Sequence, residues 1–297
     1  MSDRILPVKK AICYSGYRDG QSPSGSMPTR SQIEEDMAIL NSEGYEYIRM
    51  YDPNDHARMV LETIRANNYP MKCMIGIDNQ PEVNSHKCIF GEQNFTDEEL
   101  QAHAKRNDSE LDKLIALANE FEDIINVVSV GNESHFELVG HFVPEERLIA
   151  HVNKLHANVK QPVTYNETIG AWFDCKELAK AVDLISFHSY PYHVGTPIEN
   201  AMDEHDDNIK NIRAAFPDKE ICITELGWTT NTAHTDRPGY ACVENQIRYI
   251  TEVTEWLKKE DLVGYFFEAF DETWKADVPE ASECNWGIYG MDRKRKW

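Results

Sequence analysis

The chain has 297 residues, of which 41% are hydrophobic and 10% aromatic, enough apolar side chain for a sizeable core. Its 51 acidic and 30 basic residues give a formal charge of −21, which excludes the basic surface that nucleic-acid binding needs. The only basic cluster, residues 293–296, lies at the chain end. No apolar run reaches the roughly 18 residues that would cross a membrane. These features favour a globular protein with no nucleic-acid or membrane partner.

Seven cysteines, an odd number, include Cys13, Cys73 and Cys222 inside apolar, strand-like runs. Buried free thiols suit a reducing compartment. Residues 1–10 are polar and contain no apolar signal-peptide segment. We therefore expect a cytosolic protein, or an extracellular one if a leader has been removed.

Short apolar runs alternate with segments of helical periodicity along the chain. Ser31 to Glu34 has the spacing of a capping box and predicts the start of the first helix. Residues 79–96 are polar and form the longest irregular stretch, and the next helix is expected to break near Asn107. The predicted strands are 10–16, 45–51, 71–77, 124–130, 162–165, 182–190, a strand from Ile221, and 262–269. The predicted helices are 31–44, 57–66, 96–121, 144–160, 175–181, 198–216 and 243–259.

This alternation of strand and helix predicts an α/β fold, a closed (β/α)8 TIM barrel that spans residues 1–297 as one catalytic domain. The main alternative is an open, doubly wound sheet. Against it, no Gly-x-Gly-x-x-Gly turn follows the first strand, and the chain contains no P-loop.

Two of the predicted strands end in a glutamate. The apolar run from Ile221 leads to Glu225, and residues 124–131 lead to Asn132 and Glu133. In a parallel barrel such strand-end residues face the mouth of the active site. Paired carboxyls suit cleavage of a glycosidic bond, in which one protonates the leaving oxygen and the other, about 5–5.5 Å away, attacks the anomeric carbon. Asn132 is placed to hydrogen-bond a sugar hydroxyl beside the reacting carbon.

Aromatic side chains supply the flat surfaces on which sugar rings stack. Candidates at or just beyond strand ends are Tyr14, Tyr51, Tyr190, Tyr192, Trp228, Trp274 and Trp286. Trp256 is different, because its helical spacing with Val253 and Leu257 predicts a place in the core.

Two other kinds of catalytic site have weaker support. A zinc site would use His188 and His193 with His135 or His141, but no His-x-x-x-His or Cys-x-x-Cys occurs. A Ser-His-acid triad would lack its Gly-x-Ser-x-Gly elbow. We therefore expect neither a metal nor another cofactor.

The chain resembles glycoside hydrolase family 17, the β-1,3-glucanases and glucanosyltransferases of the clan A barrels. The resemblance covers nearly the whole length and depends on several blocks in order. These are residues 27–31 with 47–53, Val130-Gly131-Asn132-Glu133, Thr224-Glu225-Leu226-Gly227-Trp228, residues 270–275 and residues 283–287.

The resemblance implies a retaining double displacement on β-1,3-linked glucose, with Glu133 as the acid/base and Glu225 as the nucleophile. It also implies a set of residues that line the substrate cleft. They are Tyr14, Tyr51, Asn132, Tyr190, Trp228, Glu272, Lys275 and Glu283.

Some features depart from the family pattern or leave alternatives open. Leu226 and Thr229 differ from the plant motif and look closer to bacterial or fungal forms, and residues 79–96 have no counterpart. Transfer to a second sugar, as in a glucanosyltransferase, would use the same two glutamates. A barrel that binds glucan without cleaving it is the alternative from another class. Lys275 and Glu283 can also be read as a structural ion pair.

Overall fold

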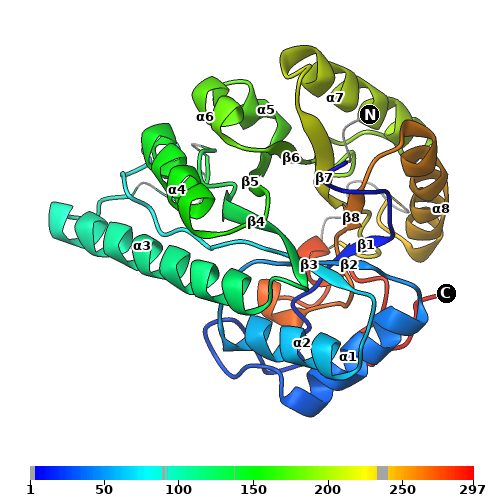
Figure 1. The fold of residues 1–297 in the computed structure, drawn as a ribbon. Coiled ribbons are helices and arrows are strands. Elements are labelled where there is room, and N and C mark those ends of the chain that lie inside the picture. The colour runs from blue at the N-terminus through cyan, green and yellow to red at the C-terminus, as the bar shows by residue number, and fades with distance from the viewer. Residues whose placement is uncertain (1–3, 89–90, 92, 137, 233–239) are drawn as a thin grey trace.

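Eight parallel strands close into one barrel in the order β1 to β8 in the computed structural model, which describes residues 4–88, 91, 93–136, 138–232 and 240–297 (Figure 1). The barrel closes where Ala11 and Ile12 of β1 pair with Tyr265 and Phe266 of β8. The predicted barrel is therefore confirmed. The strands are β1 (Ala11–Cys13), β2 (Tyr47–Met50), β3 (Lys72–Ile75), β4 (Ile125–Asn132), β5 (Val163–Thr168), β6 (Leu184–His188), β7 (Glu220–Leu226) and β8 (Gly264–Phe266).

Helices surround the barrel, and α3 is the longest of those described (Figure 1). Every predicted helix is present, and the short α5 was not predicted. Within the described part of the chain, none is long and apolar enough to span a membrane. The helices are α1 (Arg30–Ser42), α2 (Asp55–Ala66), α3 (Asp97–Glu120), α4 (Glu145–Asn158), α5 (Ile169–Trp172), α6 (Lys176–Ala181), α7 (Ala201–Ala215) and α8 (Val243–Glu260).

The first helix begins earlier than predicted. Its capping box is formed by Thr29 and Gln32, not by Ser31 and Glu34. The Gln32 side chain accepts from the Thr29 backbone N–H at 2.8 Å, while the Thr29 hydroxyl accepts from the Gln32 N–H at 3.4 Å. Both pairs have the same spacing, so the local pattern does not distinguish them.

The predicted break of α3 near Asn107 is wrong, because the helix is continuous from Asp97 to Glu120. Asn107 is buried, and its side chain accepts from the Gln80 N–H and donates to the Gln80 carbonyl, each at 2.8 Å. Asn107 therefore attaches the irregular segment after β3 to the helix. Residues 89, 90 and 92 of that segment lie outside the described residues.

The barrel interior changes from apolar to polar along the strands. In four strands an apolar residue faces the interior first, and the residue two positions later, which faces the same side, is polar. These buried polar residues are Arg49, Ser129, Ser186 and Thr224. The C-terminal end of the barrel is therefore lined with hydrogen-bonding groups. The apolar interior consists of Leu6, Ala11, Cys13, Tyr47, Met74, Val127, Leu184, Cys222, Val263 and Tyr265.

A larger apolar core lies between the strands and the surrounding helices. Trp256 belongs to it as predicted, with 6% of its surface exposed and its indole N–H donating to Asp206 at 2.7 Å. All seven cysteines are free. The cellular compartment stays a prediction.

Candidate active site

A cavity of 840 Å³ lies at the C-terminal ends of the strands and contains most of the predicted site. Glu133 and Glu225 both line it. This is the end of a (β/α)8 barrel at which active sites are built. The other predicted site residues that line the cavity are Tyr14, Tyr51, Asn132, Tyr190, Lys275 and Glu283.

Glu225 is held by three hydrogen-bond donors. Its Oε1 accepts from Arg49 Nη1 at 2.5 Å and from the Tyr51 hydroxyl at 2.9 Å, and its Oε2 accepts from the Tyr190 hydroxyl at 2.7 Å. The side chain is buried. Because every partner donates, the arrangement favours an ionised carboxylate in a fixed orientation.

Glu133 follows β4 in a left-handed backbone conformation, with φ of +49°. A non-glycine residue in this region costs about 1–3 kcal/mol and is often found at functional sites. Gly131 is needed nearby, because a Cβ there would lie 2.4 Å from Asn79 Nδ2 and 2.8 Å from Ser134 Oγ. The Glu133 side chain opens into the cavity with 29% of its surface exposed.

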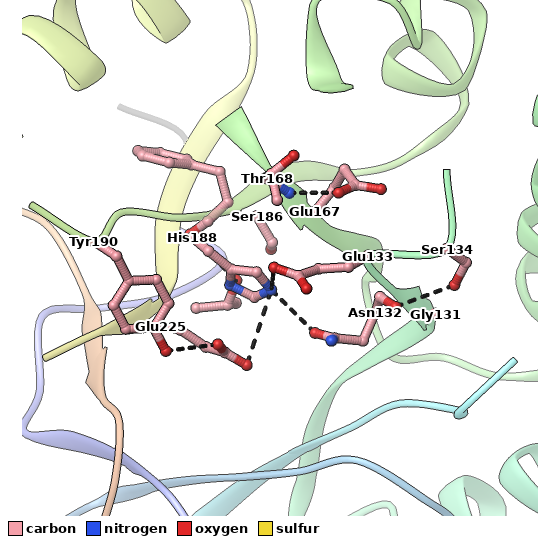
Figure 2. Close-up of polar contacts among 12 residues, drawn as sticks. Gly131, Asn132, Glu133, Ser134, Glu167, Thr168, Ser186, His188, Tyr190 and Glu225 are labelled. Carbon is pink, nitrogen blue, oxygen red and sulfur yellow. Dashed lines mark hydrogen bonds and ion pairs between the residues drawn. The ribbon is translucent and has the colours of Figure 1, made fainter. Parts of the chain in front are cut away.

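His188 lies between the two glutamates, and all three side chains point toward one another (Figure 2). Its Nε2 is 3.9 Å from Oε1 of Glu133 and 3.9 Å from Oε1 of Glu225. These two oxygens are therefore at most twice that distance apart. This upper limit leaves room for the separation of about 5–5.5 Å between the two carboxyls of a retaining glycosidase.

Asn132 connects His188 to Arg49. Its Oδ1 accepts from Arg49 Nη2 at 2.5 Å and hydrogen-bonds His188 Nε2 at 3.0 Å. The other ring nitrogen of His188 is 3.2 Å from the Thr224 hydroxyl. Among the described residues, no hydrogen bond is formed by Asn132 Nδ2, so this amide group is left to donate to a ligand.

The two glutamates have opposite pKa shifts. Burial alone would raise the pKa of Glu225, but His188, Arg49 and the hydrogen bonds from Arg49 and Tyr190 outweigh it and lower the pKa to about 2. Burial lowers the pKa of His188 to about 4, so Arg49 is the charged partner at neutral pH. Burial, together with the charges of Glu225 and Glu167, raises the pKa of Glu133 to about 8. At neutral pH the site therefore holds one carboxylate and one carboxylic acid.

Two predicted cleft residues lie outside the cavity. Trp228 is 1% exposed and packs edge-on against Tyr192 with ring centres 5.5 Å apart, while its indole N–H donates to the Tyr240 carbonyl at 2.8 Å. It therefore supports the wall behind the cavity and presents no face to a sugar. Trp286 is also 1% exposed, and neither it nor Tyr192 lines the cavity, whereas Trp274 does and is 39% exposed.

Glu272, the other predicted cleft residue that does not line the cavity, is completely buried. It accepts from the Ser15 hydroxyl at 2.8 Å, the Tyr17 N–H at 2.9 Å and the Trp274 indole at 3.1 Å. Its carboxylate thereby joins the loop after β1 to the segment after β8. Glu272 shapes the cavity wall from behind.

The ion pair between Lys275 and Glu283 is not formed. Lys275 Nζ instead donates to both oxygens of Glu268 at 2.5 Å and lies 3.2 Å from Glu272 Oε2. The 3₁₀ turn Thr273–Lys275 brings the lysine back over the end of β8. Burial raises the pKa of Glu268 well above its usual range even with Lys275 beside it.

Lys275→Met is expected to destabilise the protein by roughly 3–5 kcal/mol, because it leaves the buried carboxyls of Glu268 and Glu272 without their cation. The loss should shrink as the pH falls, since protonation of Glu268 removes the uncompensated charge. Denaturant midpoints at pH 8 and pH 5 measure both effects. Lys180→Met, which breaks an exposed pair with Glu177, should cost less than about 1 kcal/mol.

The four histidines of the alternative zinc site have other neighbours. His193 packs on the Trp286 ring with centres 5.1 Å apart, and His135 Nδ1 hydrogen-bonds the Val143 carbonyl at 2.9 Å. His141 Nε2 is 3.2 Å from the Asn132 carbonyl. No cluster of three His, Cys, Asp or Glu side chains suited to a metal ion occurs among the residues that the structure describes.

Three residues of this site were not predicted in these roles. Arg49 is 1% exposed inside the barrel, and its signal is a charged residue within the apolar strand run Tyr47–Met50. His188 was considered only as a zinc ligand. Glu167, at the end of β5, follows the same strand-then-glutamate pattern as Glu133 and Glu225.

A family model described as the BtgE/BtgC glycoside hydrolase domain matches residues 11–287. The chain is 24% identical over 301 residues to the probable glucan endo-1,3-beta-glucosidase btgC of Aspergillus clavatus, covering 91% of this chain and 39% of that protein. It is 23% identical over 313 residues to the glucan 1,3-beta-glucosidase of Arthroderma benhamiae, covering 98% of this chain and 93% of that protein. The chain thus spans about two fifths of the first relative and most of the second.

Among solved structures, the fold is similar to that of an endo-laminarinase from Formosa. The TM-score is 0.75 at 24% sequence identity, over 96% of this chain and 84% of that chain. At this identity the likeness shows the fold.

Proposed function

The chain belongs to the BtgE/BtgC glycoside hydrolase domain family, and from that premise we propose that it is a retaining hydrolase of β-1,3-linked glucan or gluco-oligosaccharides. More narrowly, we propose a place in glycoside hydrolase family 17. One observation carries the chemistry: Glu133 and Glu225 lie on either side of His188 in one cavity and have opposite pKa shifts. The linkage is supported by the two relatives named above, a probable glucan endo-1,3-beta-glucosidase and a glucan 1,3-beta-glucosidase.

In the first step, the Glu225 carboxylate attacks the anomeric carbon while Glu133 gives its proton to the leaving glycosidic oxygen. The bond from that carbon to the leaving oxygen breaks, and a glycosyl ester forms on Glu225. Arg49, Tyr51 and Tyr190 keep the attacking oxygens oriented through their hydrogen bonds to them.

In the second step, Glu133 is a carboxylate and takes a proton from water, which attacks the same carbon and releases Glu225. A sugar hydroxyl in place of water would give transfer, the reaction of a glucanosyltransferase. Asn132 Nδ2, whose amide oxygen is already occupied by Arg49 and His188, donates to a hydroxyl beside the reacting carbon.

The test is incubation with laminari-oligosaccharides of defined length, followed by product sizing and by early NMR of the anomeric protons. Shorter products released first as the β-anomer are expected. Longer products would favour the glucanosyltransferase, and initial α-anomers would rule out retention. If the folded protein leaves every β-1,3 oligomer intact, the proposed linkage is wrong. Incubation with other β-glucans then decides between two readings: cleavage of one of them indicates a different linkage, and cleavage of none indicates a barrel that only binds glucan.

The pH dependence of kcat/KM follows from the opposite pKa shifts of Glu133 and Glu225. We expect kcat/KM to be level near neutral pH and to fall as the pH rises through about 8, because Glu133 then loses the proton that it must donate. Toward low pH the decline should begin only as Glu225, with a pKa of about 2, becomes protonated. Initial rates at substrate concentrations well below KM, from pH 4 to pH 10 in steps, measure this profile. A kcat/KM that already falls as the pH rises from 5 to 6 would contradict the assignment of Glu133 as the acid.

A further inference from the structure

Glu167 is a completely buried carboxylate with no base beside it. It is the penultimate residue of β5, and no ion pair includes it among the described residues. Its Oε1 accepts from the Thr168 N–H at 2.6 Å, and its Oε2 accepts from the Tyr165 hydroxyl at 2.6 Å and the His135 N–H at 3.1 Å. All three partners donate, which favours the ionised form. Burial raises the pKa of the Glu167 carboxyl, and these three donors oppose that shift.

The Glu167 carboxyl lies beside the turn that carries Glu133. Asn132 of β4 pairs with Asn166 of β5, and the Glu133 N–H donates to the Asn166 carbonyl at 2.8 Å. Glu133 therefore follows Asn132 and Glu167 follows Asn166, so the two glutamates lie at the C-terminal ends of adjoining strands (Figure 2). The His135 N–H, two residues after Glu133, also donates to the Tyr165 hydroxyl at 2.7 Å.

We propose, on the basis of the function proposed above, that Glu167 is a positioning residue for the acid/base Glu133. Its carboxylate, together with the Tyr165 hydroxyl, anchors the chain at His135, two residues after the left-handed Glu133. Without this anchor the turn would be free to relax toward a more favourable backbone conformation. The Glu133 side chain would then lose its direction into the cavity.

The same carboxylate also opposes ionisation of Glu133, because like charges disfavour each other at short range. Burial and Glu225 act in the same direction as Glu167 on the pKa of Glu133, and Arg49 acts in the opposite direction. The charged and titratable groups around the pair, from each neighbouring element, are Arg49, Tyr165, Cys175, His188, Glu225 and Glu283.

The experiment compares Glu167→Gln with wild type on two β-1,3-linked substrates. One has a poor sugar leaving group, which needs the acid, and the other has a dinitrophenolate leaving group, which does not. We expect kcat/KM to fall at least roughly tenfold on the first and less than about threefold on the second, since general acid catalysis supplies about 10²–10⁴-fold. A carbon-13 carboxyl titration, assigned with Glu133→Gln, should show the Glu133 midpoint at lower pH than in wild type.

Asp183→Asn is the matched control. Asp183 anchors the opposite end of β5 by accepting from the Val163 N–H at 2.7 Å, so its loss weakens the same strand far from Glu133. It should leave the titration of Glu133 and the ratio between the two substrates unchanged. If Glu167→Gln does not fold, Tyr165→Phe removes the hydroxyl that joins Glu167 to His135 and should selectively slow the poor leaving group.

An equal fall on both substrates with an unmoved Glu133 titration would overturn the role of Glu167. So would the same selective change in Asp183→Asn. A wild type that cleaves neither substrate would instead overturn the proposed function. In that case the titration, which needs no turnover, still decides whether Glu167 acts on Glu133.

Discussion

Glu225→Gln is expected to lower the turnover of laminari-oligosaccharides by at least roughly 10⁴-fold, since it removes the proposed nucleophile of the covalent intermediate. The amide has the size of the carboxylate but cannot form the glycosyl ester. It would also place an NH2 group among Arg49, Tyr51 and Tyr190, all of which donate to the carboxylate now. Product release over hours at high enzyme concentration measures the residual rate.

Glu220→Gln provides the control on the same strand. Glu220 begins β7 and accepts from the N–H groups of Ile5 and Leu6 at 2.9 and 2.8 Å, at the other end of the barrel. It should retain turnover close to that of wild type. If Glu225→Gln keeps more than a tenth of the wild-type rate while folded, Glu225 is not the nucleophile.

Glu133→Gln is expected to slow cleavage of the same oligosaccharides by roughly 10²–10⁴-fold, because the leaving oxygen then departs without a proton. An aryl substrate with a dinitrophenolate leaving group needs no proton, so its first step should be nearly unaffected. Its second step still needs a base, and a burst of dinitrophenolate followed by a slow phase is expected. Stopped-flow absorbance measures the burst.

Azide gives a second readout for Glu133→Gln. This small anion attacks the glycosyl intermediate without a general base, so it should speed the slow phase and give a β-glycosyl azide. Glu225→Gln should show neither the burst of dinitrophenolate nor a β-glycosyl azide product, because it forms no glycosyl intermediate. A Glu133→Gln enzyme with equal losses on both substrates and no azide product would contradict the acid/base role.

The order of the barrel strands could be predicted from the sequence because each strand is buried on both faces and reads as an apolar run. The two catalytic candidates could be predicted for the same reason, since Glu133 and Glu225 are the first carboxylates after such runs. Element ends were less certain. Thr29 and Ser31 offer the same capping pattern, and only the packed helix shows which of them is used.

The partners of the charged residues could not be predicted, because pairing depends on which strand ends meet in the closed barrel. Arg49 and Glu225 are 176 residues apart in sequence, yet their side chains share a 2.5 Å hydrogen bond. An ion pair with Glu283 was the alternative interpretation of Lys275, but the turn after β8 directs the lysine to Glu268. Trp228 lies three residues after Glu225, and its burial depends on the packing of Tyr192 and Tyr240.

Closure of the barrel joins the two ends of the chain, and this affects how the protein folds. Ala11 pairs with Tyr265 across the seam between β1 and β8, and the Arg293 guanidinium reaches Asp36 of α1, 257 residues away in sequence. Contacts of such long range form late, because the entropy of closing the loop is lost before they are gained. Until then β1 and β8 expose unpaired backbone edges to other molecules. Refolding is therefore expected to be slow and to lose yield as protein concentration rises.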